Sequence, residues 1–357
     1  SVASRGLGDV YKRQGESIST PYVQNGNTFY YYNEGEWQHS KLMMKSCITD
    51  CAAEVLIDPN TFSEDGTFSL GGTSISPDGK LIAYAVSDGG SDWRTWYVMD
   101  IASRELLPDV IEWSKFSGAV WAKDNSGFYY QRYDTPEEEL LVDINEQPKL
   151  MFHTLGTNQI DDTIIYENPA QPRWGWSISI SENNAYKILS ISDGTEEKNR
   201  VYIQTTDSNE FLPVIDELIG EYAYLTSLDN VLFFYSTENA SNGKVVTLTI
   251  QDGAFVWNDL IAESMLPIRS VNIINKKILV TYLVDTLSKV KTFDLNGSFL
   301  EDFQFAEAGT IGGFYGGIDD EETYFNFTNY ITPSKIYKLN LNTCLLYTSP
   351  SPRDATL

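Results

Sequence analysis

Residues 74–93 read SISPDGKLIAYAVSDGGSDW, and this stretch decides the predicted fold. A short alternating run meets a turn at 77–79 (PDG), and an apolar run follows at 81–86 (LIAYAV). Proline fixes φ, aspartate caps its own backbone and glycine accepts a positive φ, so this tripeptide favours a tight turn. The flanking runs are rich in β-branched and aromatic residues, as strands are. With further strands expected at 94–99 and 106–110, the stretch predicts four antiparallel strands.

The same strand, turn and strand pattern recurs along the chain. Most copies begin about 42–52 residues apart, which is the spacing of four-stranded propeller blades. The copies lie at 23–32, 74–86, 119–130, 179–190, 225–235, 271–283 and 313–327. About seven copies are within the usual number of blades in a propeller. We therefore predict an all-β fold, a seven-bladed β-propeller with four antiparallel strands in each blade.

The chain of 357 residues carries a formal net charge of -25, from 50 acidic and 25 basic side chains. This balance disfavours nucleic acid as a partner, because a phosphate backbone requires a basic surface. No run of about 18 apolar residues occurs, so no membrane span is predicted. The acidic run at 136–139 (PEEE) is interpreted as a solvated loop, and a calcium site there would lack alternating ligands. Solubility is the simplest consequence of the acidic surface.

The potential metal ligands are few and scattered. Cys47 and Cys51 could form half a metal site, but no second pair of cysteines or histidines lies at ligand spacing. Cys344 is remote in sequence, and His39 and His153 are isolated. We therefore predict no metal site and no cofactor. The sequence shows no disulfide framework, so it leaves the redox compartment undetermined.

Both ends of the chain differ from the repeating pattern. Residues 1–14 (SVASRGLGDVYKRQ) and 344–357 (CLLYTSPSPRDATL) resemble translated sequencing-adapter sequence. The predicted organisation is thus a non-native extension at 1–14, the propeller at 15–343 and a non-native tail at 344–357. Genuine flexible termini are the alternative. On the first interpretation, a signal peptide or a following domain would be invisible in this sequence.

Several short motifs, taken in order, resemble the propeller of the prolyl oligopeptidase family. They are DPNTFSEDGT at 58–67, GSDW at 90–93, LPDV at 107–110, KFS at 115–117, HTLG at 153–156, PRW at 172–174 and GEY at 220–222. The resemblance covers most of the chain. It implies a seven-bladed propeller that caps an α/β-hydrolase domain, whose Ser/Asp/His triad cuts short peptides after proline. It also implies that the propeller excludes large folded proteins and closes the active-site cavity with its inner face.

The chain itself shows no sign of the triad. A Gly-x-Ser-x-Gly elbow does not occur in the sequence. His39 and His153 both lie in predicted blade sequence, so neither is a candidate triad histidine. We therefore predict no catalytic residue in this chain. We expect the chain to be inactive alone, although the family it resembles consists of serine endopeptidases.

The resemblance implies three cavity-facing residues. Phe116, within the KFS motif, matches an aromatic position that lines the substrate pocket, although a plain core role is the alternative. Trp174 and Thr195 match other cavity-side positions. The sequence departs from the animal members here, with Gly175 in place of a methionine and Thr195 in place of a cysteine. These departures leave the specificity of the cavity open.

Two further residues are implied to face the hydrolase domain. Asp92 would form an ion pair with an arginine of that domain, and Trp93 lies beside it at the boundary. The alternative for Asp92 is a local cap on the turn at 89–90.

Two functions from different classes follow. One is the gating propeller of a serine-type prolyl endopeptidase, with short proline-containing peptides as partners. The other is a stand-alone propeller that acts as a protein-binding scaffold, and a dipeptidyl peptidase or oligopeptidase B type from the same clan is a weaker third. A monomer is expected. The resemblance implies a cytoplasmic location, and a lost signal peptide would instead imply the periplasm. We also expect the ring to close by side-chain packing, without a sheet shared by the first and last blades.

Overall fold

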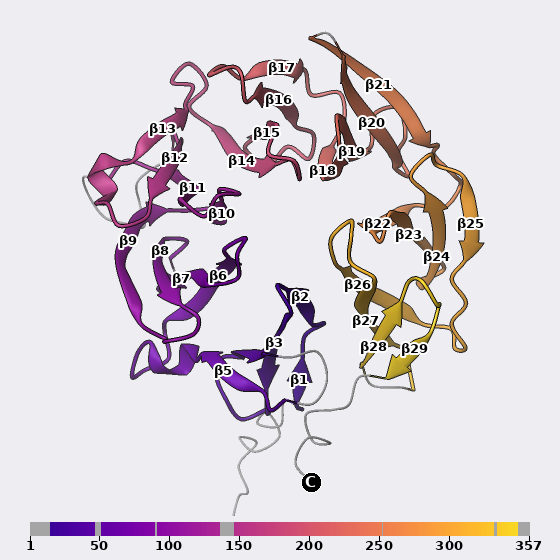
Figure 1. The fold of residues 1–357 in the computed structure, drawn as a ribbon, viewed down its shortest axis with the longest axis horizontal. Coiled ribbons are helices and arrows are strands. Elements are labelled where there is room, and N and C mark those ends of the chain that lie inside the picture. The colour runs from indigo at the N-terminus through magenta and orange to yellow at the C-terminus, as the bar shows by residue number, and fades with distance from the viewer. Residues whose placement is uncertain are drawn as a thin grey trace, which may run out of the picture.

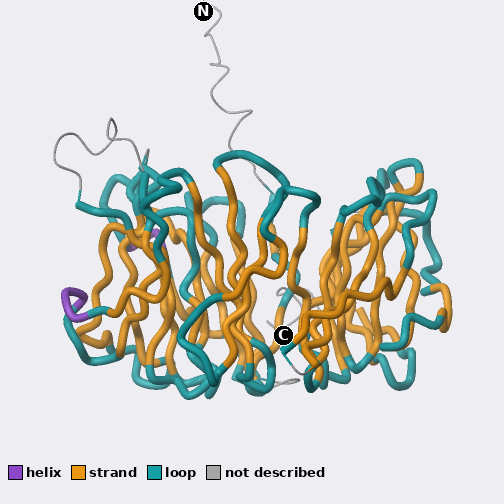
Figure 2. The backbone as a smooth tube through the Cα atoms, turned by 90° about the horizontal axis from the view of Figure 1, so that it is seen from above, coloured by secondary structure: helices purple, strands orange, loops and turns teal. Residues whose placement is uncertain are grey.

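The computed structural model describes residues 15–46, 51–89, 91–135, 146–251, 253–331 and 334–348. Within these ranges the strands are grouped in sheets around a central axis (Figure 1). Seen from the edge, the molecule is a disc whose strands run through its thickness (Figure 2). The helical elements of the described residues are short turns, η2 (Pro59–Thr61) and η3 (Gln159–Asp161). The prediction of an all-β propeller is confirmed.

Two sheets form the N-terminal part of the ring. The first sheet contains β1 (Ser17–Ile18), β2 (Tyr22–Gln24), β3 (Asn27–Asn33), β4 (Lys41–Lys45) and β5 (Glu54–Ile57). The eight-stranded sheet contains β6 (Ser69–Ile75), β7 (Leu81–Ser87), β8 (Arg94–Asp100), β9 (Leu106–Ser114), β10 (Val120–Trp121), β11 (Gly127–Arg132), β12 (Lys149–Thr154) and β13 (Thr163–Tyr166). All of their pairings are antiparallel.

Four four-stranded sheets complete the described ring. The β14 sheet contains β14 (Trp174–Ile180), β15 (Tyr186–Asp193), β16 (Arg200–Thr205) and β17 (Leu212–Ile215). It is followed by β18 (Tyr222–Leu228), β19 (Val231–Ser236), β20 (Lys244–Gln251) and β21 (Ala254–Ile261). The next sheet contains β22 (Ile268–Ile274), β23 (Lys277–Val284), β24 (Leu287–Asp294) and β25 (Phe299–Asp302). The last contains β26 (Thr310–Tyr315), β27 (Glu322–Thr328), β28 (Lys335–Asn340) and β29 (Leu346–Thr348).

The prediction of seven four-stranded blades is wrong. The described strands form six sheets, of which five have the four or five strands of a single blade and one has eight. The cause is the length of β9, which runs for nine residues and reaches the next unit. There Ser114 pairs with Arg132 of β11, and the Tyr133 N–H donates to the Trp113 carbonyl oxygen at 2.9 Å. Backbone pairing thus joins two units that the sequence pattern suggested were separate.

The turn that decided the predicted fold forms as its chemistry requires. Gly79 has a φ of 73°, and its N–H donates to the Ser76 carbonyl oxygen at 2.9 Å. The Asp78 carboxylate accepts from the Ser76 hydroxyl at 2.7 Å and from the Lys80 N–H at 3.1 Å. The turn joins β6 to β7, whose residues from Ile82 to Ala85 are buried. Local turn chemistry therefore sets the register of this hairpin.

Apolar side chains from neighbouring sheets pack together to form the core. Phe29 and Leu42 of the first sheet, for example, share one cluster with Ile82 and Met99 of the eight-stranded sheet. Trp176 of the β14 sheet shares another cluster with Tyr129 and Leu150 of the eight-stranded sheet. Because no single sheet buries both of its faces alone, each depends on its neighbours around the ring.

The first and last sheets meet at the ring seam, which we define by Thr20, Gly313 and Asn326. The Asn326 Nδ2 donates to the Thr20 hydroxyl at 3.0 Å. Among the described residues no strand of the first sheet pairs with a strand of the last, so the expected closure by side chains is confirmed there. Strand β29 pairs with β28 and lies within the range 344–357 that the sequence suggested was a non-native tail.

We expect Gly313→Ala to destabilise the protein by about 1–3 kcal/mol more than Gly253→Ala, through overpacking at the ring seam. Both glycines have a positive φ, of 100° and 77°, so both alanines are strained. A Cβ at Gly313 would lie 2.9 Å from the Thr20 Cγ2, whereas a Cβ at Gly253 meets nothing within 4 Å. Urea unfolding of the two variants measures the difference. Equal losses would mean that the seam has room for the methyl group.

Three simple findings limit the chemistry of the described residues. None of their helices is long and apolar enough to cross a membrane. Their His, Cys, Asp and Glu side chains include no group of three or more that could hold a metal ion. Cys51 is disulfide-bonded and Cys344 is free. The sequence pattern showed no disulfide framework, yet the chain does contain a disulfide bond. Cys47 and the acidic run at 136–139 lie outside the described residues.

Candidate functional site

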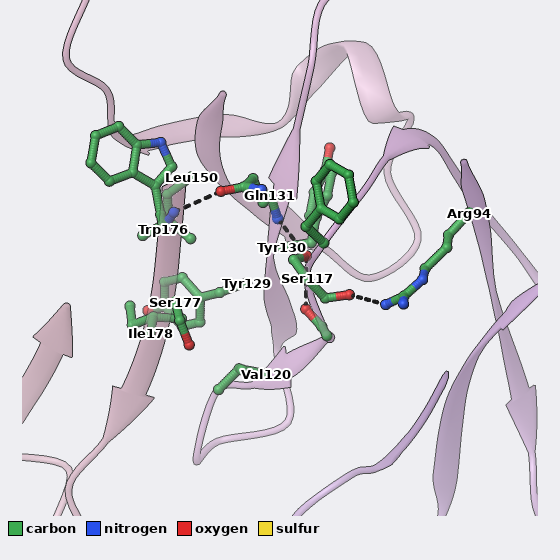
Figure 3. A pocket seen from close by; sticks show the side chains of 12 residues that line it. Arg94, Ser117, Val120, Tyr129, Tyr130, Gln131, Leu150, Trp176, Ser177 and Ile178 are labelled. Carbon is green, nitrogen blue, oxygen red and sulfur yellow. Dashed lines mark hydrogen bonds between the residues drawn. The ribbon is translucent and has the colours of Figure 1, made fainter. Parts of the chain in front are cut away.

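A pocket of about 370 Å³ lies between the eight-stranded sheet and the β14 sheet (Figure 3). The eight-stranded sheet contributes strands β8 and β11 and the loop that follows β9. The β14 sheet contributes Trp176, Ser177 and Ile178. A volume in this range is typical of small-molecule and peptide subsites. The pocket is therefore the candidate functional site.

Phe116 lines this pocket and is 60% exposed. Its φ of 52° lies in the left-handed region, which is unusual for a bulky residue. The preceding residue, Lys115, turns inward instead, and its Nζ lies 3.9 Å from the centre of the Trp93 ring. Burial lowers the pKa of Lys115, which the charge of Asp92 partly offsets. The backbone at Phe116 is therefore in a strained conformation, and the ring is exposed in the pocket. Phe116 is thus not a core side chain.

Gln131 forms the back of the pocket and connects its two sheets. Its Nε2 donates to the Lys115 carbonyl oxygen at 3.1 Å. Its Oε1 accepts from the Trp176 N–H at 2.7 Å (Figure 3). The Gln131 N–H donates to the Ser117 hydroxyl at 2.9 Å. Because Gln131 is almost completely buried, these bonds are shielded from water. They fix the loop that carries Phe116 relative to β14.

Arg94 stands at the opposite side of the pocket, at the start of β8 (Figure 3). Its Nη1 donates to the Ser117 carbonyl oxygen at 2.8 Å. None of the described acidic side chains lies within ion-pair distance of the guanidinium. The cation therefore faces the pocket without a carboxylate partner in the described chain.

Trp174 and Thr195 lie apart from this pocket, in and beside the β14 sheet. Trp174 is only 8% exposed and packs against Trp176 in the core. The Arg200 guanidinium lies 4.3 Å from the centre of its ring. Thr195 is exposed on the loop after β15. The structure therefore does not place either of them beside Phe116.

Asp92 and Trp93 lie in the loop before β8. Asp92 is exposed, and Trp93 packs edge-on against Trp113 with ring centres 5.5 Å apart. Tyr133 lies between Trp93 and Phe116, at 6.2 Å from the first ring and 6.5 Å from the second. The structure thus gathers Trp93 and Phe116 into one aromatic group and leaves the Asp92 carboxylate at the surface.

Sequence reasoning missed Arg94, Gln131, Trp176 and Ser177. A weak signal existed for Gln131, since a polar residue ends the aromatic run FYY at 128–130. No comparable signal marked Arg94, which follows the GSDW motif directly. Only the fold shows that Arg94 faces a pocket.

A second buried polar group lies in the same sheet around His153. The fully buried imidazole has its Nδ1 2.7 Å from Asp162 Oδ1 and its Nε2 2.9 Å from Asp109 Oδ1. The Tyr130 hydroxyl donates to Asp162 Oδ2 at 2.7 Å, and the Gly156 N–H donates to Asp109 at 2.6 Å. His153 has no cysteine or histidine at ligand spacing in the sequence, and the fold instead gives it two carboxylate partners.

The two carboxylates determine the charge of His153. Burial alone would lower the pKa of the imidazole, but hydrogen bonds and charge from Asp162 and Asp109 raise it above its ordinary value. Each ring nitrogen faces a carboxylate oxygen, and an ionised carboxylate can only accept, so this geometry favours the imidazolium form with a proton on both nitrogens. Burial and the bond to Asp162 also raise the pKa of Tyr130. His153 is therefore part of an ion cluster and not a free base.

The family model described as the prolyl oligopeptidase N-terminal β-propeller domain matches residues 11–347. The prolyl endopeptidase of Elizabethkingia miricola is 34% identical over 330 residues, which cover 92% of this chain and 46% of that protein. The dual function macrocyclase-peptidase POPB of Amanita bisporigera is 29% identical over 266 residues, covering 68% of this chain and 36% of that protein. The chain therefore spans about half the length, or less, of these curated relatives.

Solved structures have the same architecture. A structure from a study of two prolyl endopeptidases matches with a TM-score of 0.84 and 26% identity, over 95% of this chain and 50% of that one. Prolyl oligopeptidase B from Galerina marginata matches in fold with a TM-score of 0.86 and 24% identity, over 96% of this chain and 52% of that one. The family model, supported by the prolyl endopeptidase of Elizabethkingia miricola, shows that the chain belongs to the prolyl oligopeptidase family, in which it corresponds to the N-terminal β-propeller domain.

Proposed function

We propose that this propeller is the size filter of a serine-type prolyl endopeptidase and admits short proline-containing peptides to a hydrolase domain. The observation that carries the proposal is the position of Phe116. This residue, implied by the family resemblance to line the substrate pocket, is exposed in a pocket of about 370 Å³ and is held there against backbone strain. The curated relatives that support the assignment are named prolyl endopeptidases.

The propeller would contribute binding and exclusion, and not the chemical step. Acyl transfer requires a nucleophile, a base and an oxyanion hole held in register. His153 is committed to its two carboxylates, and His39 lies 2.8 Å from the Gly66 carbonyl oxygen. The exposed Asp92, beside Trp93, is our candidate for an ion pair with the hydrolase domain. Thr195, on its exposed loop, is our candidate for a second contact with the cavity, and Trp174 would support that loop from the core.

A chimera tests the filter. The chain is fused to the part of the Elizabethkingia miricola prolyl endopeptidase that it does not match, and two substrates are compared. We expect cleavage of a chromogenic Gly-Pro peptide, with a folded proline-containing protein spared and its unfolded fragments cut. The chain alone should cleave neither substrate above background. A chimera that cuts the folded protein as fast as the peptide would refute the filter.

In the same chimera, we expect Phe116→Ala to weaken peptide cleavage by about tenfold with little change in melting temperature. The reason is that an exposed ring stacked on a proline or apolar side chain contributes about 1 kcal/mol beyond its area burial. Phe299→Ala is the matched control, since Phe299 is 53% exposed on β25 of a different sheet. Kinetics and thermal unfolding are measured together. A large fall in melting temperature with unchanged kinetics in the folded fraction would assign Phe116 to packing.

A further inference from the structure

We infer that the pocket between β8, β11 and β14 is a carboxylate subsite, in which Arg94 binds a carboxylate of a short peptide and Phe116 supports the neighbouring side chain. The inference rests on the proposed function for the peptide nature of the ligand. The carboxylate preference itself comes from the residues that line the pocket.

The charge of the pocket is opposite to that of the chain. Acidic side chains outnumber basic ones by 50 to 25 in the sequence, so most of the surface repels a carboxylate. Among the described residues that line the pocket, Arg94 is the one charged side chain, and it is a cation. The pocket is therefore a positively charged site on a protein whose net charge is negative, and it favours anionic ligands.

The guanidinium has donors to spare. Arginine carries five N–H donors, and the contact that the structure gives Arg94 uses Nη1, which donates to the Ser117 carbonyl oxygen at 2.8 Å. That bond fixes the side chain while leaving the remaining N–H groups for a ligand. A planar fork held in place suits a carboxylate, which it can bind through two parallel hydrogen bonds.

The opposite walls supply the rest of the site. Ser177 is exposed on β14, and its hydroxyl has no hydrogen-bond partner within the described chain. The exposed Phe116 ring lines the same pocket, so a side chain next to the carboxylate would find an apolar platform. The Gln131 amide already donates to the Lys115 carbonyl oxygen and the Tyr133 hydroxyl and accepts from the Trp176 N–H, and it therefore acts as a fixed wall. A cation, a hydroxyl and an aromatic ring together fit a carboxylate attached to an apolar or proline-containing segment.

Binding to this chain alone tests the inference without a hydrolase domain. Three acetylated peptides are compared by calorimetry, and acetylation removes the amine that the acidic surface would attract. They are acetyl-Gly-Pro-Phe as the free acid, the same peptide as its amide, and acetyl-Asp-Pro-Phe amide. We expect the free acid to bind about tenfold more tightly than its amide, as a charge-assisted pair would give. The aspartyl peptide shows whether a side-chain carboxylate serves as well as a terminal one.

Variants separate binding from folding. Arg94→Gln should abolish the preference for carboxylate, whereas Arg104→Gln, which lies just beyond the other end of β8 and pairs with Glu54, should retain it. Ser177→Asp should also abolish the preference by repulsion, while leaving the bond between Arg94 and Ser117 intact. Equal binding of all three peptides to the wild-type chain, or a carboxylate preference that survives both Arg94→Gln and Ser177→Asp, would overturn the inference. Failure of the chimera to filter substrates would leave this binding result unaffected.

Discussion

Replacing His153 by alanine is expected to lower the free energy of unfolding by about 3–5 kcal/mol, because it leaves Asp109 and Asp162 as buried charges without a counterion. Both carboxylates are fully buried at their contacts with the ring, and one Asp109 oxygen already lacks a hydrogen-bond partner. His39→Ala is the matched control, since His39 is half-buried and contacts a backbone carbonyl oxygen. Its loss should be about 1 kcal/mol, as for an ordinary hydrogen bond. Urea unfolding that gave the same loss for both variants would contradict the ion cluster.

The same cluster predicts the direction in which the free energy of unfolding changes with pH. The pKa of His153 is raised in the folded state, so the cation is bound more tightly there than in the unfolded chain. Its contribution to stability is therefore complete below the unfolded value of about 6.5 and is lost as the pH rises through the folded pKa. The groups that face the ring are Asp109 on β9, Asp162 after η3 and, through Asp162, Tyr130 on β11.

The free energy of unfolding, measured at intervals between pH 6 and pH 9, tests whether stability falls as the pH rises. The wild-type chain should lose stability over that range, and His153→Gln, which has no proton to release, should lose less. A stability curve with the same slope for both proteins would show that His153 does not titrate as the geometry requires. Groups outside the cluster contribute equally to the two curves, so the difference between them reports the cluster of His153, Asp109 and Asp162.

Gln131→Ala should destabilise the protein by about 2–6 kcal/mol, since it removes the partner of two buried backbone groups at about 1–3 kcal/mol each. These are the Lys115 carbonyl oxygen in the eight-stranded sheet and the Trp176 N–H in the β14 sheet. Gln131→Glu retains the shape but would place a buried carboxylate against the Lys115 carbonyl oxygen, so its loss should be at least as large. Chemical unfolding measures both.

Gln204→Ala is the control for this prediction. Gln204 is also buried, but its side chain accepts from the flexible Lys187 amine at 2.9 Å, which can turn to water when the amide is removed. We expect a loss of about 1 kcal/mol there. If the two alanine variants were equally stable, Gln131 would not connect the sheets in the manner that its hydrogen bonds suggest.

The sequence predicted the parts of this fold that depend on local chemistry. The turn at 77–79 and the alternating strands around it follow from residues adjacent in the chain, and the structure has them in place. The family motifs likewise led to a propeller of the prolyl oligopeptidase type. The predicted number of separate blades was wrong because the pairing of Ser114 with Arg132 joins two of them in one sheet. This pairing depends on how far β9 extends, which no turn signal in the sequence marks.

The site was less accessible to sequence reasoning. Phe116 follows a strand pattern that usually buries its aromatic residues, yet the structure has it in a left-handed backbone conformation with its ring exposed. His153 and Asp109 are 44 positions apart, so their contact depends on the register of the eight-stranded sheet. Arg94 became a candidate only when the fold placed it in a pocket without an acidic side chain. Contacts between distant residues therefore account for what the sequence did not reveal.

The bridge between β9 and β11 has a consequence for how the ring opens in solution. Proteins exchange amide hydrogens through cooperative opening units that often coincide with supersecondary motifs. In the four-stranded sheets such a unit can be a single sheet, because no strand of one pairs with a strand of its neighbour. Isolated backbone bonds do cross between them, such as the one from the Lys276 N–H to the Ile318 carbonyl oxygen at 2.8 Å, but they form no continuous ladder. In the eight-stranded sheet, backbone bonds cross from one unit to the next, and the buried His153 cluster connects the same two parts. Amides on β7 and β12 should therefore exchange at similar rates, through a shared opening event larger than that of any other sheet.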